Sequence, residues 1–138
     1  MFQSMARVAA MSALIMVLPA SSAHAQAPFA FNPDTSTCSG VPDAQEVAGT
    51  WQATVSPASP RVGDPVTMGL RGSGSSLQVT LILVGPDGEV IDLLDGNAGD
   101  DQVAEFTKLA AASGVHTMVW AQSYTGLYIT CSGFTAES

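Results

Sequence analysis

Residues 77–94 read LQVTLILVGPDGEVIDLL, and β-strand periodicity is clearest here. The first half of this stretch alternates apolar and polar side chains, as a half-buried strand does, and residues 81–84 are then apolar on both faces. A strand that is covered on both faces lies centrally in a sheet. Residues 85–88 (GPDG) are typical of a turn, so we expect residues 89–94 to return as the hairpin partner.

The same alternation recurs on both sides of this hairpin. Residues 50–55 and 66–71 alternate upstream of it, and residues 115–122 and 127–134 predict a terminal hairpin downstream. Short strands with turn signals every 8–12 residues are typical of an antiparallel sandwich. The sequence therefore predicts an all-β fold over residues 49–138, a small antiparallel β-sandwich of jelly-roll or immunoglobulin-like type with about seven strands.

Residues 102–110 allow two interpretations. Ala104 and Phe106 would share one face of a strand, whereas Val103, Phe106 and Leu109 sit at helical spacing. We prefer a strand, because the surrounding sequence is consistently of the β type.

The first 25 residues have the order of a secretory signal peptide. Arg7 precedes an apolar run over residues 8–18, and the segment ends in an A-x-A pattern at Ala23 and Ala25. An uncleaved membrane anchor is the alternative, but a helix needs about 20 apolar residues to cross the hydrocarbon core. No later stretch is long and apolar enough to cross a membrane. The sequence thus predicts a cleaved leader and a periplasmic or secreted protein that is not inserted in the membrane.

Cleavage after Ala25 would leave 113 of the 138 residues, the size of one domain. Residues 26–48 are rich in Pro, Ser, Thr and Ala without a clear period, so we expect an extended lead-in, ordered around Cys38. The leader carries Arg7 and no acidic residue, so its removal takes the net charge from −8 to −9. Such a field repels phosphate backbones and anionic lipid, which disfavours nucleic acid as a partner.

Cys38 and Cys131 are the two cysteines of the chain. In an oxidising compartment they most simply pair with each other. The disulfide would close a loop of about 90 residues and restrict the unfolded chain by about 4–5 kcal/mol. A catalytic redox role would favour C-x-x-C, which the sequence lacks.

The order of these features resembles the bacterial pre-peptidase C-terminal domain, a secreted β-sandwich module. The resemblance rests on LILVGPDG at 81–88, the acidic stretch 95–101, EFT at 105–107, GVHTMVW at 114–120 and TGLYI at 125–129. His116 departs from the aromatic residue that this family usually has there, and family members are usually appended to larger exported proteins. The resemblance implies a non-catalytic accessory or binding module, in some relatives with calcium.

An acidic cluster over residues 92–101 allows a calcium site. Carboxylate and amide oxygens are the ligands that calcium prefers, but the spacing is not an EF-hand, because Phe106 stands where a Glu would be needed. A solvated hairpin loop over residues 95–101 is the alternative, since Asp, Asn and Gly are ordinary turn residues. The candidate ligands are Asp92, Asp95, Asn97, Asp100 and Asp101.

No catalytic set is visible in the sequence. His116 is the only histidine after cleavage, and a triad would need a nucleophile and a carboxylate beside it. The chain has no G-x-S-x-G elbow, and residues 72–74 (GSG) lack the downstream glycine and helix of a phosphate loop. We expect His116 to be a partly buried strand residue and the protein not to be an enzyme.

Three aromatic residues cluster around the terminal hairpin: Trp120, Tyr124 and Tyr128. Exposed aromatics could stack on sugar rings or pack against a partner protein, and core packing is the alternative. The sequence therefore predicts an exported binding or accessory module for a protein or polysaccharide surface that requires no cofactor, with calcium assistance as an option. The competing hypothesis is a structural or inhibitory protein that uses an edge strand or loop.

Overall fold

The computed structural model describes residues 26–41 and 46–138, and the predicted leader lies outside them. These residues form nine strands and no helix, so this part of the chain holds no helix that could cross a membrane. All pairs between the strands are antiparallel. The strands are β1 (Ala30–Asn32), β2 (Thr37–Ser39), β3 (Trp51–Ser56), β4 (Pro65–Gly72), β5 (Leu77–Val84), β6 (Val90–Ala98), β7 (Val103–Leu109), β8 (Gly114–Gln122) and β9 (Tyr128–Ala136).

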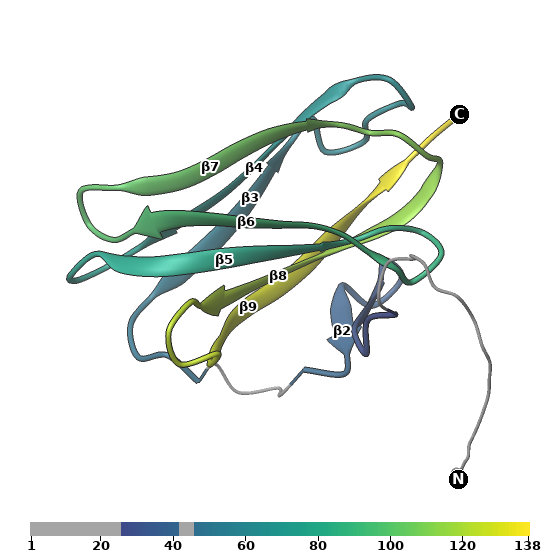
Figure 1. Cartoon of the computed structure of the whole chain (residues 1–138). Coiled ribbons are helices and arrows are strands. Elements are labelled where there is room, and N and C mark those ends of the chain that lie inside the picture. Colours follow the sequence, from purple (N-terminus) through teal and green to yellow (C-terminus); the bar gives the residue numbers. More distant parts are fainter. Residues whose placement is uncertain (1–25, 42–45) are drawn as a thin grey trace, which may run out of the picture.

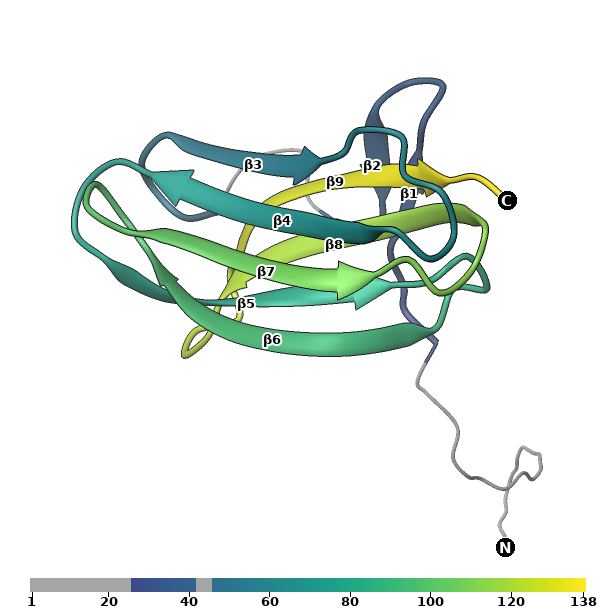
Figure 2. The ribbon, with the colours of Figure 1, turned by 90° about the horizontal axis from the view of Figure 1, so that it is seen from above.

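Seven of these strands form the predicted sandwich. One sheet has the order β3-β4-β7 and the other the order β6-β5-β8-β9, and the two lie face to face (Figures 1 and 2). Alternate side chains of each strand point between the sheets, as period-two patterning requires. The largest fully buried side chains of the core between the sheets are Val66, Met68, Leu70, Val79, Leu81, Met118, Trp120 and Ile129.

Strand β5 is central, as its sequence predicts. It pairs with β6 on one side and with β8 on the other. Leu81 and Leu83 face the core, whereas Ile82 and Val84 belong to a second apolar cluster on the opposite face of the sheet. The unbroken apolar run of β5 is therefore explained by two covered faces.

The N-terminal segment covers that second face. Phe29 is buried against Val84 and Val119, and the Phe31 amide donates a hydrogen bond of 2.9 Å to Thr117 Oγ1. Phe31 also lies directly over Gly133, where a side chain would collide with its ring. Residues 26–41 of the predicted lead-in thus form a packed strap, and its short hairpin of β1 and β2 lies against the four-stranded sheet (Figure 2).

The predicted disulfide is confirmed. Cys38 in β2 is bonded to Cys131 in β9, with 6.3 Å between their Cα atoms. The bond ties the strap to the sheet that it covers, and it indicates an oxidising environment.

The prediction of a loop over residues 95–101 is wrong for residues 95–98. Strand β6 continues to Ala98, with Asp95 opposite Thr80 and Asn97 opposite Gln78. These residues tolerate a strand because β6 is an edge strand whose polar side chains face solvent. Gly96 lacks a side chain where Phe106 approaches, 3.1 Å from an ideal Cβ position.

Residues 103–109 form a strand, which excludes the helical alternative. Strand β7 pairs with β4 along its whole length, with Ala104 opposite Leu70 and Phe106 opposite Met68. Val103 and Leu109, which a helix would place beside Phe106, are exposed instead. Period two therefore describes this segment better than helical spacing.

Candidate functional site

The five predicted calcium ligands lie in separate places. Asp92 points toward β7, where its Oδ2 atom lies 2.7 Å from Lys108 Nζ. The hydrogen bond from Lys108 holds the pKa of the Asp92 carboxyl below its usual value, with the positive charge of Lys108 adding to the effect and partial burial opposing it. Asp95 lies on the other face of β6 and accepts a 2.7 Å hydrogen bond from Thr80 Oγ1.

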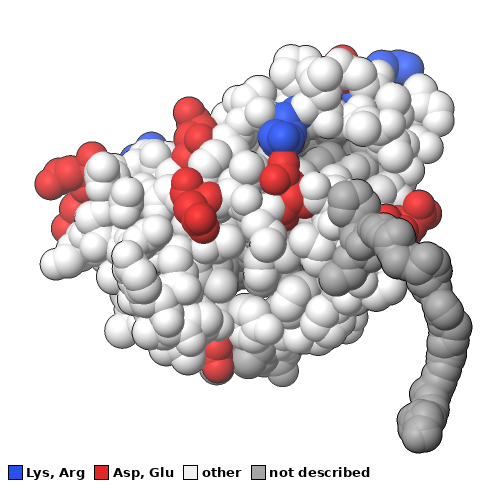
Figure 3. All heavy atoms as spheres, viewed as in Figure 1, with Lys and Arg blue, Asp and Glu red and all other residues white. Residues whose placement is uncertain are grey.

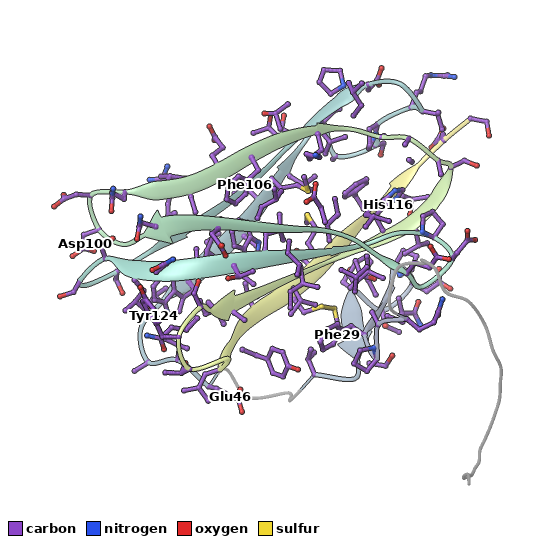
Figure 4. The ribbon with its side chains drawn as sticks, in the orientation of Figure 1. Phe29, Glu46, Asp100, Phe106, His116 and Tyr124 are labelled. Atoms are coloured by element: carbon purple, nitrogen blue, oxygen red, sulfur yellow. A yellow bond between two sulfur atoms is a disulfide. The ribbon has the colours of Figure 1, made fainter. Side chains whose placement is uncertain are left out.

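Asp100 and Asp101 lie in the turn between β6 and β7, at one tip of the sandwich (Figure 4). This turn is clasped to the β4–β5 turn, because the Asp100 amide donates to the Gly74 carbonyl and the Ser76 hydroxyl donates to Gln102 Oε1. The two turns line an open polar hollow. No group of three His, Cys, Asp or Glu side chains in residues 26–41 and 46–138 is placed to hold a metal ion. The sequence cluster therefore does not form one ligand set.

The three aromatic candidates also separate. Trp120 is completely buried and stacks on Phe106, with 6.0 Å between ring centroids, so it cannot act as a surface stacking residue. Tyr128 is half-buried and packs edge-on against Phe29. Tyr124 alone is open to solvent, at 84% exposure, in the turn between β8 and β9. Core packing explains Trp120, and only Tyr124 is available for stacking.

His116 is a buried strand residue. Its ring stacks on Phe134 with 4.6 Å between centroids, and its Nδ1 atom lies 3.1 Å from the Gly114 carbonyl oxygen. Burial lowers the pKa of His116, and the hydrogen bond to Gly114 opposes this effect. Figure 4 shows it between the sheets, far from Asp100. Its polar partner is a backbone carbonyl rather than a carboxylate, and this geometry differs from that of a hydrolase triad.

A surface that sequence analysis missed lies on β6. Leu93 is 62% exposed, and Asp95 follows it on the same face. Ile91 is also partly exposed, but it lies at a β-bulge, because Leu83 is opposite Asp92 and Val84 is opposite Val90. Its side chain lines the small cavity beside His116 and does not share the face of Leu93. Leu93 lies opposite Ile82 of β5, which is half-buried. We call Leu93, Asp95 and Ile82 the β6 patch. The sequence could not reveal it, because either alternating set within residues 90–95 holds two apolar residues and one Asp, and a bulge between Val90 and Asp92 shifts the alternation.

Comparisons with known proteins do not show a family or a function for this chain. No family model matches the chain, and no curated protein matches it. Among solved structures, it is similar to a β-glucosidase from Listeria innocua in complex with glucose, at 8% identity and a TM-score of 0.40, over 65% of this chain and 16% of that one. It is also similar to a β-glucosidase from Erythrobacter marinus, at 14% identity and a TM-score of 0.39, over 64% of this chain and 15% of that one. The chain thus spans about a sixth of these enzymes, and so distant a likeness carries no argument about function.

Proposed function

We propose that this protein is an exported, non-catalytic binding or accessory module that acts on a protein or polymer surface. The observation that supports it most is the β6 patch. Leu93 presents an aliphatic side chain to solvent, opposite the half-buried Ile82 of β5 and on the same face as Asp95. Neighbouring exposed apolar side chains that are rimmed by polar groups are typical of interaction sites.

Export is the second part of the proposal. The leader pattern ends in A-x-A before Gln26, and the Cys38–Cys131 disulfide fits the oxidising compartment that such a leader leads to. The periplasm or the medium is therefore the place to look for the partner. The resemblance to the pre-peptidase C-terminal domain, also a proposal, agrees with this.

A pull-down tests the proposal. The exported protein, carrying a C-terminal tag, is used to capture partners from envelope and culture fractions, and the same preparation is incubated with peptide, ester and glycoside substrates. We expect specific recovery of a partner and no turnover. Turnover of a substrate without a specific partner would overturn the proposal, and its loss in His116→Ala would identify a hydrolase.

A calcium ion at the β6–β7 turn is a separate part of the proposal. Asp100 and Asp101 line the polar hollow, and a calcium ion bound there in the folded state would raise the melting temperature. The test compares melting in calcium and in chelator, for the wild type and for Asp100→Asn combined with Asp101→Asn. Identical curves for the wild type would dispose of calcium, and a shift that persists in the double variant would place the ion elsewhere.

A second candidate function is inhibition of an exported protease by an edge strand. Proteins that bind extended chains often pair with them as added β-strands, and β6 is an edge strand. Inhibition assays against a panel of exported proteases test this function. Inhibition that Leu93→Asp abolishes would support this function, and failure to inhibit any protease would count against it.

A further inference from the structure

The outer edge of β6 is open. Strand β6 pairs with β5 on one side, and over the described ranges, 26–41 and 46–138, no backbone hydrogen bond closes its other side between Val90 and Ala98. Glu89, just before β6, is bridged to Gln26, and the opposite edge of the same sheet is bridged at its two ends. Strand β9 is capped at one end by the Glu46 amide, which donates to the Tyr128 carbonyl, and at the other by contacts of Glu137 with residues 60–62. Both edges of the sheet are therefore free of backbone partners over most of their length in the described residues, and β6 is the edge that also carries the exposed Leu93.

The regular part of this open edge, residues 92–98, can accept another strand. Proteins often protect such an edge with an inward-pointing charge. Asp92 is that kind of charge, but Lys108 of β7 neutralises it from within the sandwich. The outward face of β6 keeps its exposed Leu93, so this device does not make the patch polar.

The chemistry of the β6 patch specifies what kind of strand fits. A strand added to β6 would place alternate side chains beside Leu93 and Asp95, since period two brings them to one face. Asp95 accepts a hydrogen bond from Thr80 and, unlike Asp92, has no cationic partner in the part of the chain that the structure describes. An aliphatic residue would match Leu93, and a Lys or Arg two positions away would match Asp95.

The net charge of the protein favours a strand of a different protein, rather than a second copy of this chain, as the occupant of the β6 edge. The protein carries a net charge of −8, and Figure 3 shows acidic groups scattered over the side on which β6 and β7 lie, with few basic ones. Two copies that meet through β6 would repel each other, whereas a segment that carries lysine or arginine would be attracted.

We propose that the open edge of β6 binds an extended segment of a partner protein by strand addition, with an aliphatic residue on Leu93 and a basic residue two positions away on Asp95. This inference rests on the proposed function, because it names the site and the partner class of the binding module.

The experiment uses a defined probe on the exported protein. A labelled peptide has threonine at odd positions and valine and lysine in turn at even positions, and a matched peptide has glutamate in place of lysine. Amide chemical shifts and binding curves are recorded for the wild type, Leu93→Asp, Asp95→Asn and Val103→Asp. Val103 lies on β7, is 43% exposed and serves as the matched control.

We expect the lysine peptide to shift the amides of β6 and the glutamate peptide to bind much more weakly. Leu93→Asp should weaken binding about tenfold. Asp95→Asn should weaken it about threefold at low salt and reduce its salt dependence. Val103→Asp should bind as the wild type does. If Leu93→Asp does not fold, Leu93→Thr, which retains strand propensity, should weaken binding in the same direction.

Three results would overturn the inference. They are shifts that map to the β3-β4-β7 sheet, equal binding of the two peptides, and a wild-type dimer with its interface on β6. A pull-down that still recovers a partner, with no effect of Leu93→Asp, would leave the proposed function standing while this inference fails.

Discussion

Lys108 Nζ lies 2.7 Å from Asp92 Oδ2, so one ion pair joins β7 of the first sheet to β6 of the second. Both side chains are partly exposed, and pairs of this kind contribute about 0–1 kcal/mol. The first prediction concerns the size of this contribution.

We expect Lys108→Met to lower the free energy of unfolding by about 0.5 kcal/mol at pH 7. The folded-state pKa of Asp92 is lowered, so the stabilisation is present above the ordinary pKa of an aspartate. It is lost as the pH falls through the lowered value, because the unfolded chain takes up the proton first. Urea denaturation at pH 7 and pH 3 checks this, with Asp92→Asn closing the double-mutant cycle. A difference that is as large at pH 3 as at pH 7 would mean that Lys108 acts through packing.

His116 should make the fold sensitive to mild acid. Its folded-state pKa is lowered from 6.5 by burial, so the unfolded chain binds the proton more readily. Stability is therefore complete above about pH 6.5 and falls as the pH drops from there through the folded-state pKa. The charged groups near the ring are Lys108, which lines the same small cavity, and its partner Asp92. His116→Phe, which can keep the stack on Phe134, should flatten the pH dependence of the melting temperature, and an unchanged slope would contradict this.

Removing the disulfide should weaken the strap and the fold. Cys38→Ala combined with Cys131→Ala should lower the free energy of unfolding by about 4 kcal/mol, because a loop of 93 residues is no longer closed in the unfolded chain. Phe29→Ala is the companion variant, which removes the buried ring and keeps the bond, at a cost of about 3 kcal/mol. Guanidinium denaturation of both variants measures the effects. A loss below 1 kcal/mol in both would show that the strap does not stabilise the sandwich.

Truncation should lower the free energy of unfolding strongly at Trp120 and hardly at all at Tyr124. Trp120→Ala opens a large cavity between the sheets and should cost about 3–5 kcal/mol. Trp120→Phe should cost clearly less, because the indole N–H is buried and has no hydrogen-bond partner among the described residues. Tyr124→Ala should stay within about 0.5 kcal/mol of the wild type. Thermal melts of the three variants test this order, and a severe loss in Tyr124→Ala would be incompatible with its position.

The sequence predicts most of this fold, because period two is strong wherever a strand has one covered face. Strands β3, β4 and β5 follow from it, and so does the terminal hairpin. The end of β6 was not predicted, since Asp95, Gly96 and Asn97 are turn residues that an edge strand tolerates. The cover over Val84 and Val119 was not predicted either, because nothing in residues 26–41 has a strand period.

The candidate site was less predictable than the fold. Proximity in sequence suggested that Asp92 and Asp95 act together, but residues three apart in a strand point to opposite faces. Leu94 lies opposite Leu81 and faces the core, whereas Leu93 lies opposite Ile82 and faces outward. This assignment depends on the register with β5 and on the bulge between Val90 and Asp92, which only the structure gives. The β6 patch is therefore a property of the packing.

Hydrogen exchange of the exported protein, alone and bound to the partner recovered in the pull-down, tests most directly whether β6 is the binding edge. We expect the amides of Val90–Ala98 to gain protection in the complex, with little change in β3 and β4. Protection confined to the three-stranded sheet, or to the turn that holds Tyr124, would contradict this.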